Sequence, residues 1–264
     1  MTVIALEYHD VVDSHDRDAS GFPGAAAASY KLDRENFRLH LDRLAACGSR
    51  VGAAAEAAIA DPDTTHVLLT FDDGGASART VIGPELSARG WCAHVFIPTD
   101  RIGTRGFLGN DDLRALRGEG HVIGSHSASH PMRMSHLRPQ ELREEWRRSV
   151  GVLTDLLGEP APVASVPGGY YDDRVAEAAA EAGIRLLFTS EPVTRIHRVS
   201  SCAVMGRFTL RRGHQANAVG ALVGSSPLAR QGQWLSWNAR KLVKRVAGEA
   251  YLRLREARFG RAGK

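Results

Sequence analysis

Short apolar runs alternate with longer segments of helical periodicity along most of this chain, and this alternation restricts the fold more than any other feature. The apolar runs occupy residues 2–6, 67–71, 93–97 and 122–123. The helix-period segments occupy residues 34–47, 76–89, 111–117, 138–157 and 174–182. Strands that alternate with helices of this length predict βαβ units and a parallel sheet. The predicted fold class is therefore α/β.

Polar clusters follow several of the apolar runs, at the point where each predicted strand ends. The first run leads into Glu7-Tyr8-His9-Asp10, the second into Asp72-Asp73, and the fourth precedes His126. Because loops at the carboxyl ends of parallel strands converge on a rigid sheet, chemistry gathers there in such folds. We expect the functional site at this edge, with residues 13–30 forming a long loop nearby.

The cysteine content and the N-terminal sequence guide the expected location. Cys47, Cys92 and Cys202 are odd in number and form no CxxC pair, which excludes a disulfide framework and a cysteine zinc finger. No run approaches the roughly 18 apolar residues that would span a bilayer. The first ten residues, MTVIALEYHD, lack the basic lead and long apolar core of a secretory signal. We therefore expect a cytoplasmic protein.

Positive charge is concentrated at the C-terminal end. Residues 233–264 contain nine Lys or Arg and two Glu, a net charge of +7, whereas residues 1–232 carry a net charge of −3. An acidic body argues against nucleic-acid binding. We predict a domain at 1–232 and a basic amphipathic helical tail at 233–264. That tail suits either peripheral contact with an anionic membrane or packing on the domain with a solvated basic face.

Two pairs of residues at the predicted strand ends carry the chemistry. Asp72 and Asp73 precede Gly74-Gly75, and a turn relaxed by glycine lets both carboxylates reach one cavity. A metal would separate their roles, with one Asp as ligand and the other as base. His126 and His130 are four positions apart, so one helical turn would present both to an ion. Alone, each pair has an ordinary structural interpretation as a turn or a solvated pair; together they favour a catalytic metal site.

The strings that carry these pairs resemble known motifs. Residues 70–74 (TFDDG) and 126–130 (HSASH) resemble the first two motifs of the polysaccharide deacetylases, carbohydrate esterase family four, also called the NodB homology domain. Residues 166–170 (VPGGY) resemble the third motif. The resemblance spans about residues 2–214. It implies a distorted (β/α) barrel of about seven parallel strands, here followed by the C-terminal amphipathic helix.

The resemblance also implies residue roles. Asp72 corresponds to the catalytic base, and the metal ligands correspond to Asp73, His126 and His130. Residues 6–10 (LEYHD) resemble a subgroup that includes poly-N-acetylglucosamine deacetylases, in which the N-terminal strand supplies the catalytic acid. This similarity assigns the acid role to His9. A histidine is suited to protonate a leaving amine near neutral pH.

Two departures from the family pattern are visible. The third motif usually has an arginine two residues before its proline, where it orients the base, and this chain has Ser165 there. The late motif that ends a strand with a histidine is not recognisable, because His197 and His214 lie in Arg-rich contexts. The first departure leaves the tuning of Asp72 open, and the second is explained if His9 is the acid.

The predicted activity is metal-dependent removal of the N-acetyl group from an N-acetylated amino sugar in a polysaccharide, oligosaccharide or lipid-linked glycan. Two imidazoles and a carboxylate suit Zn²⁺, with Co²⁺, Ni²⁺ or Fe²⁺ as alternatives. Substrate binding and oxyanion stabilisation are assigned to the loop Pro167, Gly168, Gly169 and Tyr170. The alternative functions are a deformylase or another non-peptide amide hydrolase, and a non-catalytic glycan-binding barrel.

Overall fold

A curled, mostly parallel sheet forms the centre of the molecule in the computed structural model, which describes residues 3–52 and 65–239. Its hydrogen-bonded order is β10-β11-β9-β8-β7-β6-β5-β1-β12, and β4 pairs with the first half of β5. Only the β10–β11 pair is antiparallel among the pairs of this sheet in the described ranges. The strands are β1 (Val3–Tyr8), β4 (Arg50–Gly52), β5 (His66–Phe71), β6 (His94–Ile97), β7 (Val122–Ser125), β8 (Val163–Ser165), β9 (Leu186–Phe188), β10 (Ile196–Val199), β11 (Cys202–Met205) and β12 (Phe208–Thr209).

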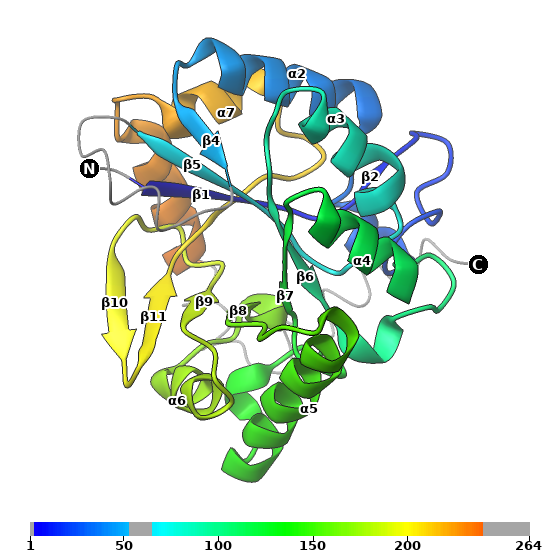
Figure 1. The fold of residues 1–264 in the computed structure, drawn as a ribbon. Helices are drawn as coiled ribbons and strands as arrows, with labels where there is room; N and C mark the ends of the chain where they lie inside the picture. Colours follow the sequence, from blue (N-terminus) through cyan, green and yellow to red (C-terminus); the bar gives the residue numbers. More distant parts are fainter. Residues whose placement is uncertain (1–2, 53–64, 240–264) are drawn as a thin grey trace.

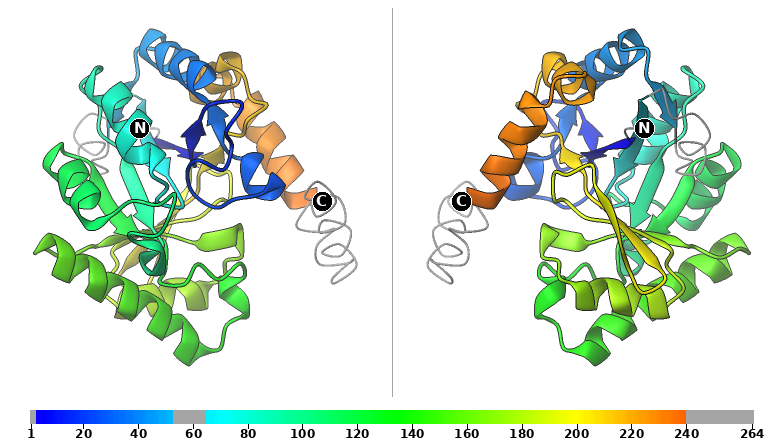
Figure 2. Two further views of the ribbon diagram at one scale, coloured as in Figure 1. Left: turned by 90° about the vertical axis from the view of Figure 1, so that its right-hand side faces the viewer. Right: turned by 90° about the vertical axis from the view of Figure 1, so that its left-hand side faces the viewer.

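Helices cover the outer face of this sheet (Figures 1 and 2). The α-helices are α1 (Ala25–Ala28), α2 (Arg34–Ala46), α3 (Gly83–Ser87), α4 (Asn110–Gly118), α5 (Pro139–Leu157), α6 (Asp173–Glu181) and α7 (Ala216–Val223). Sequence signals set their ends. Pro139 begins α5, where the Glu141 carboxylate accepts a hydrogen bond from the Arg138 N–H, and Gly158 ends it with φ 72°. The Asp172 carboxylate caps α6 by accepting from the Arg174 N–H.

The two faces of the central strands differ in composition. Along β1, Ile4, Leu6 and Tyr8 pack outward against a core completed by α2 and α7, whereas Val3 and Ala5 belong to a smaller interior cluster. Because side chains alternate along a strand, the interior position that follows Ala5 is Glu7. The interior is therefore apolar near the amino ends of the strands and becomes charged at their carboxyl ends.

This architecture confirms the predicted α/β class, and its curled half-barrel of parallel strands is consistent with the distorted (β/α) barrel of about seven strands that the family resemblance implies. The strands predicted from apolar runs are β1, β5, β6 and β7. The other six strands of the ten-stranded sheet were not predicted. β4, β8, β9 and β12 are only two or three residues long, and the β10–β11 hairpin extends one end of the sheet. Such short segments show no periodicity that a sequence pattern can detect.

Several predicted segments differ in detail. The helix expected over 76–89 is divided into a π-helical stretch, Ala78–Ile82, and α3. The loop expected over 13–30 contains the single turn α1. A small second sheet pairs β2 (Val11–Val12) with β3 (Leu32–Asp33), so both ends of that loop are fixed.

The C-terminal tail is described only in part. Residues 228–239 are helical, and the rest of the predicted amphipathic helix, 240–264, lies outside the described residues. None of the helices in the described ranges combines the length and the apolar character that crossing a bilayer requires.

Candidate active site

Asp72 and Asp73 follow β5 directly, and the backbone sends their side chains in different directions. The Asp72 N–H donates to the carbonyl oxygen of Tyr8 at 3.0 Å, so Asp72 continues the pairing of β5 with β1. Asp73 then turns the chain with φ 73°, a conformation that Asp adopts more readily than most residues. Both carboxylates nonetheless lie near His126, whose Nε2 is 3.9 Å from Oδ2 of Asp72 and 3.5 Å from Oδ1 of Asp73.

His126 and His130 approach Asp73 from the segment that follows β7. The Nε2 atoms of His126 and His130 lie 3.5 Å and 3.2 Å from Oδ1 of Asp73, and the imidazole centroids are 4.9 Å apart. The prediction that a helical turn presents the two histidines is wrong. The segment is a bent loop in which Ser127 and His130 have φ of 61° and 60°, and the Ser127 hydroxyl accepts a hydrogen bond from the His130 N–H.

These three side chains fit a divalent metal. Their ligand atoms all lie within 4.8 Å of one another. Two ligands about 2.1 Å from a tetrahedral ion stand roughly 3.4 Å apart, close to both Asp73–His separations. Burial alone would raise the pKa of Asp73, but its hydrogen bonds to His126 and His130 hold that pKa well below the usual range. Asp73 is thus an anion at neutral pH, as a metal ligand must be.

Ser165 fixes the tautomer of His126. Its hydroxyl lies 3.1 Å from Oδ1 of Asp72, to which it donates, and 2.6 Å from Nδ1 of His126. Since that hydroxyl proton is given to Asp72, its oxygen accepts the Nδ1–H of His126. The lone pair of His126 then lies on Nε2, facing Asp73. A hydrogen bond of this kind orients metal-binding histidines in proteins.

Arg207 holds Asp72 from the opposite side, and sequence analysis did not identify it. Its Nη1 donates to Oδ1 of Asp72 at 2.7 Å and its Nη2 donates to Oδ2 at 2.8 Å. Arg207 is fully buried, and its guanidinium lies over the rings of Phe96 and Phe188. The arginine that the resemblance expects at position 165 is therefore replaced by a guanidinium from the segment between β11 and β12. A sequence signal exists: Arg207 is the single charge in the apolar run 202–210.

The charge of Arg207 determines the ionisation of Asp72. Burial alone would raise the pKa of Asp72, but the Arg207 guanidinium and, to a lesser extent, His126 lower it to about 2. Glu7, also buried, has Oε1 at 3.6 Å from Arg207 and accepts hydrogen bonds from Ser190 and Thr209. Two buried carboxylates thus flank one guanidinium, and Asp72 is ionised at neutral pH.

His9 lies beside this pair, at the end of β1. Ligand atoms of Glu7, His9 and Asp72 lie within 4.8 Å of one another, so His9 lies beside the predicted base. Its imidazole packs against Tyr30 with centroids 4.8 Å apart, and its buried Nδ1 has no hydrogen-bond partner in the described chain. The neighbouring carboxylate of Asp10 does not orient it, because Asp10 accepts from Ser20 and Ser77 instead.

The loop over 13–30 lies at the site, as predicted. Phe22 stands with its ring centroid 4.6 Å from that of His130, and Tyr30 contacts His9. Lys31 fixes the loop from below, since its buried ammonium donates to the carbonyl oxygens of Arg17, Ser20 and Phe22. One loop therefore supports both a predicted metal ligand and the predicted acid.

The loop Pro167–Gly169 and Tyr170 borders the site after β8. Gly168 and Gly169 have φ of 65° and 69°. A Cβ on Gly168 would collide with the carbonyl oxygen of Met132, and one on Gly169 would lie 3.1 Å from the Trp237 ring. The glycines therefore permit close packing against the protein itself. The Tyr170 ring packs against His136 and lies under the Arg133 guanidinium, at 5.7 Å in each case.

Comparisons with known proteins agree with this geometry. The family model described as polysaccharide deacetylase matches residues 60–187. YxkH of Bacillus subtilis (strain 168), which bears a polysaccharide deacetylase name, is 25% identical over 202 residues, covering 75% of this chain and 72% of the relative.

Solved structures share the fold. The deacetylase PplD of Streptococcus pyogenes, in complex with acetate, matches with a TM-score of 0.67 at 18% identity, over 85% of this chain and 99% of that one. IcaB of Ammonifex degensii matches with a TM-score of 0.66 at 19% identity, over 88% and 96%. The family model and the relative together identify a polysaccharide deacetylase domain in this chain, matched over residues 60–187, and the solved structures agree with its fold.

Proposed function

We propose that the protein is a metal-dependent deacetylase that removes the N-acetyl group from an amino sugar of a polysaccharide, oligosaccharide or lipid-linked glycan. The observation that carries the proposal is the separation of two adjacent carboxylates. Asp73 faces two imidazoles, whereas Asp72 is held apart by Arg207 and Ser165. A metal hydrolase needs this division between a ligand and a free base.

The metal would be held by Asp73, His126 and His130, with Zn²⁺ as the proposed ion. When bound, such an ion polarises the acetyl carbonyl and lowers the pKa of water from about 15.7 towards 7. Three protein ligands leave coordination positions open, as in other catalytic sites.

Groups of the protein itself transfer the protons and stabilise the oxyanion. Asp72, ionised and oriented by Arg207, accepts the proton of the attacking water. A backbone N–H of Gly169 or Tyr170 donates to the developing oxyanion, an interaction typically worth about 3 kcal/mol. His9 then donates a proton to the departing amine, which cannot leave as an anion.

Two substitutions test the division of roles. We expect Asp73→Ala to lose bound metal and acetate release together, because it removes a ligand. We expect Asp72→Asn to keep the metal while kcat falls at least about a thousand-fold, because the base is lost and the three metal ligands remain. The measurements are elemental analysis and acetate release from N-acetylglucosamine oligomers. Asp111→Asn, on the exposed side of α4, is the control.

The outcomes separate the alternatives. Undiminished turnover in Asp72→Asn contradicts the base assignment. Release of formate rather than acetate from a panel of amides indicates a deformylase or another amide hydrolase. A wild-type protein with less than about half an equivalent of metal, inert on every glycan, indicates a binding barrel.

Membrane contact and a cytoplasmic location remain predictions from the sequence. In residues 228–239, Trp234 and Leu235 are 43% and 62% exposed and would meet such a surface. Trp237 of the same helix instead packs on Gly169, which attaches this part of the tail to the active-site loop. Sedimentation with anionic vesicles, compared between the wild type and Leu235→Glu, tests the membrane prediction.

A further inference from the structure

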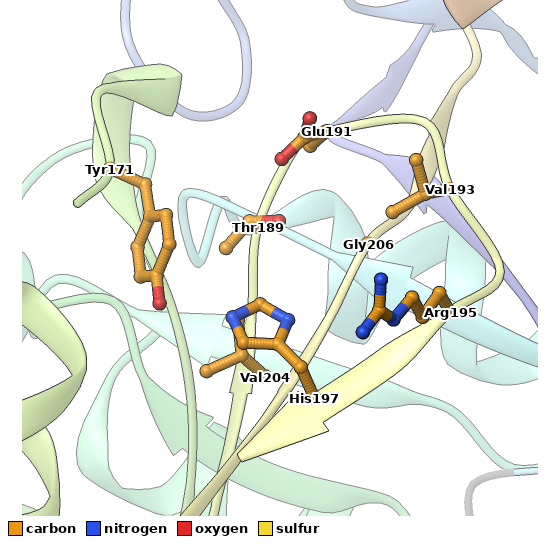
Figure 3. Close-up of a pocket in the computed structure, with 8 residues that line it drawn as sticks. All are labelled: Tyr171, Thr189, Glu191, Val193, Arg195, His197, Val204 and Gly206. Atoms are coloured by element: carbon orange, nitrogen blue, oxygen red, sulfur yellow. The ribbon is translucent and has the colours of Figure 1, made fainter. Parts of the chain in front are cut away.

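A cavity lies on the outer side of the sheet, beside the edge that carries the predicted catalytic residues. It has a volume of about 420 Å³, within the range of about 300–1,000 Å³ that small-molecule sites occupy. Figure 3 shows its lining, which comes from the segment before α6, the loop after β9 and the β10–β11 hairpin: Tyr171, Thr189, Glu191, Val193, Arg195, His197, Val204 and Gly206.

The backbone register places this cavity next to the predicted base. Ser165, which donates to Asp72, is aligned with Phe188 of β9, and Phe188 is aligned with Met205 of β11. The next residues on those two strands, Thr189 and Gly206, line the cavity. The cavity therefore begins one residue beyond the level of the site, on the other face of the same strands.

The loop after β9 borders both the catalytic centre and the cavity. Ser190 donates a hydrogen bond to Glu7 on the catalytic side, at 3.0 Å. Its neighbours Thr189 and Glu191 line the cavity. Arg207 connects the same two places, because it binds Asp72 and donates from Nε to the Thr189 carbonyl oxygen at 3.3 Å. One thickness of backbone thus separates the cavity from the catalytic centre.

Three ionisable side chains of the cavity lack protein partners in the described chain, whereas the Tyr171 hydroxyl donates to Asp173. Among the described residues, the side chains of Glu191, Arg195 and His197 make no hydrogen bond or ion pair, although His197 packs edge-on to Tyr171 at 6.5 Å. Figure 3 shows the imidazole of His197 and the guanidinium of Arg195 projecting into the hollow, with the Tyr171 ring on the other side. A carboxylate, a guanidinium and an imidazole are therefore available to a ligand.

The mixture of charges identifies the ligand class. Glu191 would repel an anionic ligand, and Arg195 would repel a cationic one. An uncharged ligand with many hydroxyls can bond to both charges at once. Val193, Val204 and the Tyr171 ring offer apolar surface to its C–H face. These are the properties of a pyranose.

We infer that this cavity binds a second sugar unit of the glycan, beyond the unit that is deacetylated. The inference rests on the proposed function, because it takes the substrate to be an oligosaccharide or polysaccharide. The chain would pass over the loop at Ser190, so the protein would favour long substrates over short ones.

Binding measurements with oligomers of two lengths test this inference. The ligands are the dimer and the pentamer of N-acetylglucosamine, titrated by calorimetry into protein carrying Asp72→Asn, which prevents hydrolysis. We expect the added change Arg195→Ala or Glu191→Ala to weaken pentamer binding about five-fold or more, the effect of one lost hydrogen bond, and to leave dimer binding unchanged. Arg198→Ala is the matched control, because Arg198 alternates to the opposite face of β10.

Each result is decisive. Unchanged pentamer affinity in both variants, an equal loss for dimer and pentamer, or a parent protein that does not bind the pentamer overturns the inference. If the affinity loss is specific to the pentamer but the wild type releases no acetate, sugar binding in the cavity is supported and the proposed deacetylation is wrong. If acetate is released with no dependence on Arg195, the deacetylation stands and the cavity does not bind sugar.

Discussion

The inner and outer faces of the curled sheet belong to the same strands but carry side chains of different kinds. Outward residues of β1 and β5, such as Leu6 and Leu69, are apolar and fully buried under helices. Inward residues change along each strand, so that Leu68 of β5 is followed on the same face by Thr70 and then Asp72. The outside is stabilised mainly by apolar area, whereas the inside combines a small apolar cluster with buried charges.

Burying charge on the inside requires that each group be matched. Asp72 and Glu7 lie on either side of Arg207, and the guanidinium also donates to Oγ1 of Thr70. Removing one member of such a set leaves an uncompensated charge, which costs far more than the net stabilisation of the set. The inside is therefore expected to be intolerant of single changes, and the outside to respond in proportion to lost volume.

Arg207 gives the largest expected difference between the two faces. Arg207→Lys keeps the positive charge but loses the paired donation to Asp72, because an ammonium is a point donor. We expect kcat to fall about a hundred-fold with bound metal retained. Arg207→Met removes the charge and is expected to lower the free energy of unfolding by about 3–5 kcal/mol as well. Acetate-release kinetics and urea unfolding measure the two effects.

A kcat of Arg207→Lys close to the wild-type value would show that the guanidinium geometry does not orient Asp72. Arg117→Lys is the control, because Arg117 makes a similar paired donation, to the partly exposed carboxylate of Glu159 rather than to the base. If Arg207→Lys acted only by destabilising the fold, its metal content would fall together with its kcat.

The sequence predicted the outside of the sheet well and the inside only in part. Apolar periodicity reveals β1, β5 and the long helices because helix cover makes one face uniformly apolar. The pairs Asp72-Asp73 and His126–His130 were found because each is local in sequence. The turn at His130 was not predicted, because the positive φ of Ser127 and His130 arises from loop packing that no residue pattern encodes.

Arg207 was missed for a related reason. Its contact with Asp72 joins residues 135 positions apart, through the pairing of the two-residue strand β12 with β1. A two-residue strand has no detectable period. A lone arginine within an apolar run is a usable signal, but it indicates only that a buried partner exists and not which carboxylate it is.

Leu41 tests the outside of the sheet. It is fully buried in α2, within the core that covers β1. We expect Leu41→Ala to lower the free energy of unfolding by about 3 kcal/mol, the sum of lost transfer energy and a residual cavity. Urea unfolding measures this loss, and kcat/KM and metal content at 25 °C should stay at wild-type values. A large fall in kcat in the folded variant would contradict the independence of the two faces.

His94 gives the smallest effect and tests whether burial of a titratable group on the inside has its own cost. It lies on β6 with its ring against those of Phe96 and Phe188, and its Nδ1 has no hydrogen-bond partner in the described chain. Burial lowers the pKa of His94 from 6.5 to about 4. Between these values the unfolded chain binds a proton that the folded chain does not, so stability falls as the pH drops below 6.5. The expected contribution between pH 7 and pH 5 is about 2 kcal/mol.

Urea unfolding of His94→Leu and the wild type at pH 7 and pH 5 isolates this contribution. Both series need EDTA, because protonation of metal ligands would otherwise add a second pH dependence. His40, His121 and His214 also have pKa values lowered by burial, so the wild type should lose more than 2 kcal/mol and the variant should recover only the His94 part. His15→Leu, at an exposed position, should change nothing. Equal pH dependence in His94→Leu and the wild type would mean that His94 takes up its proton without leaving the folded interior, and that the inside of the sheet tolerates an unmatched charge after all.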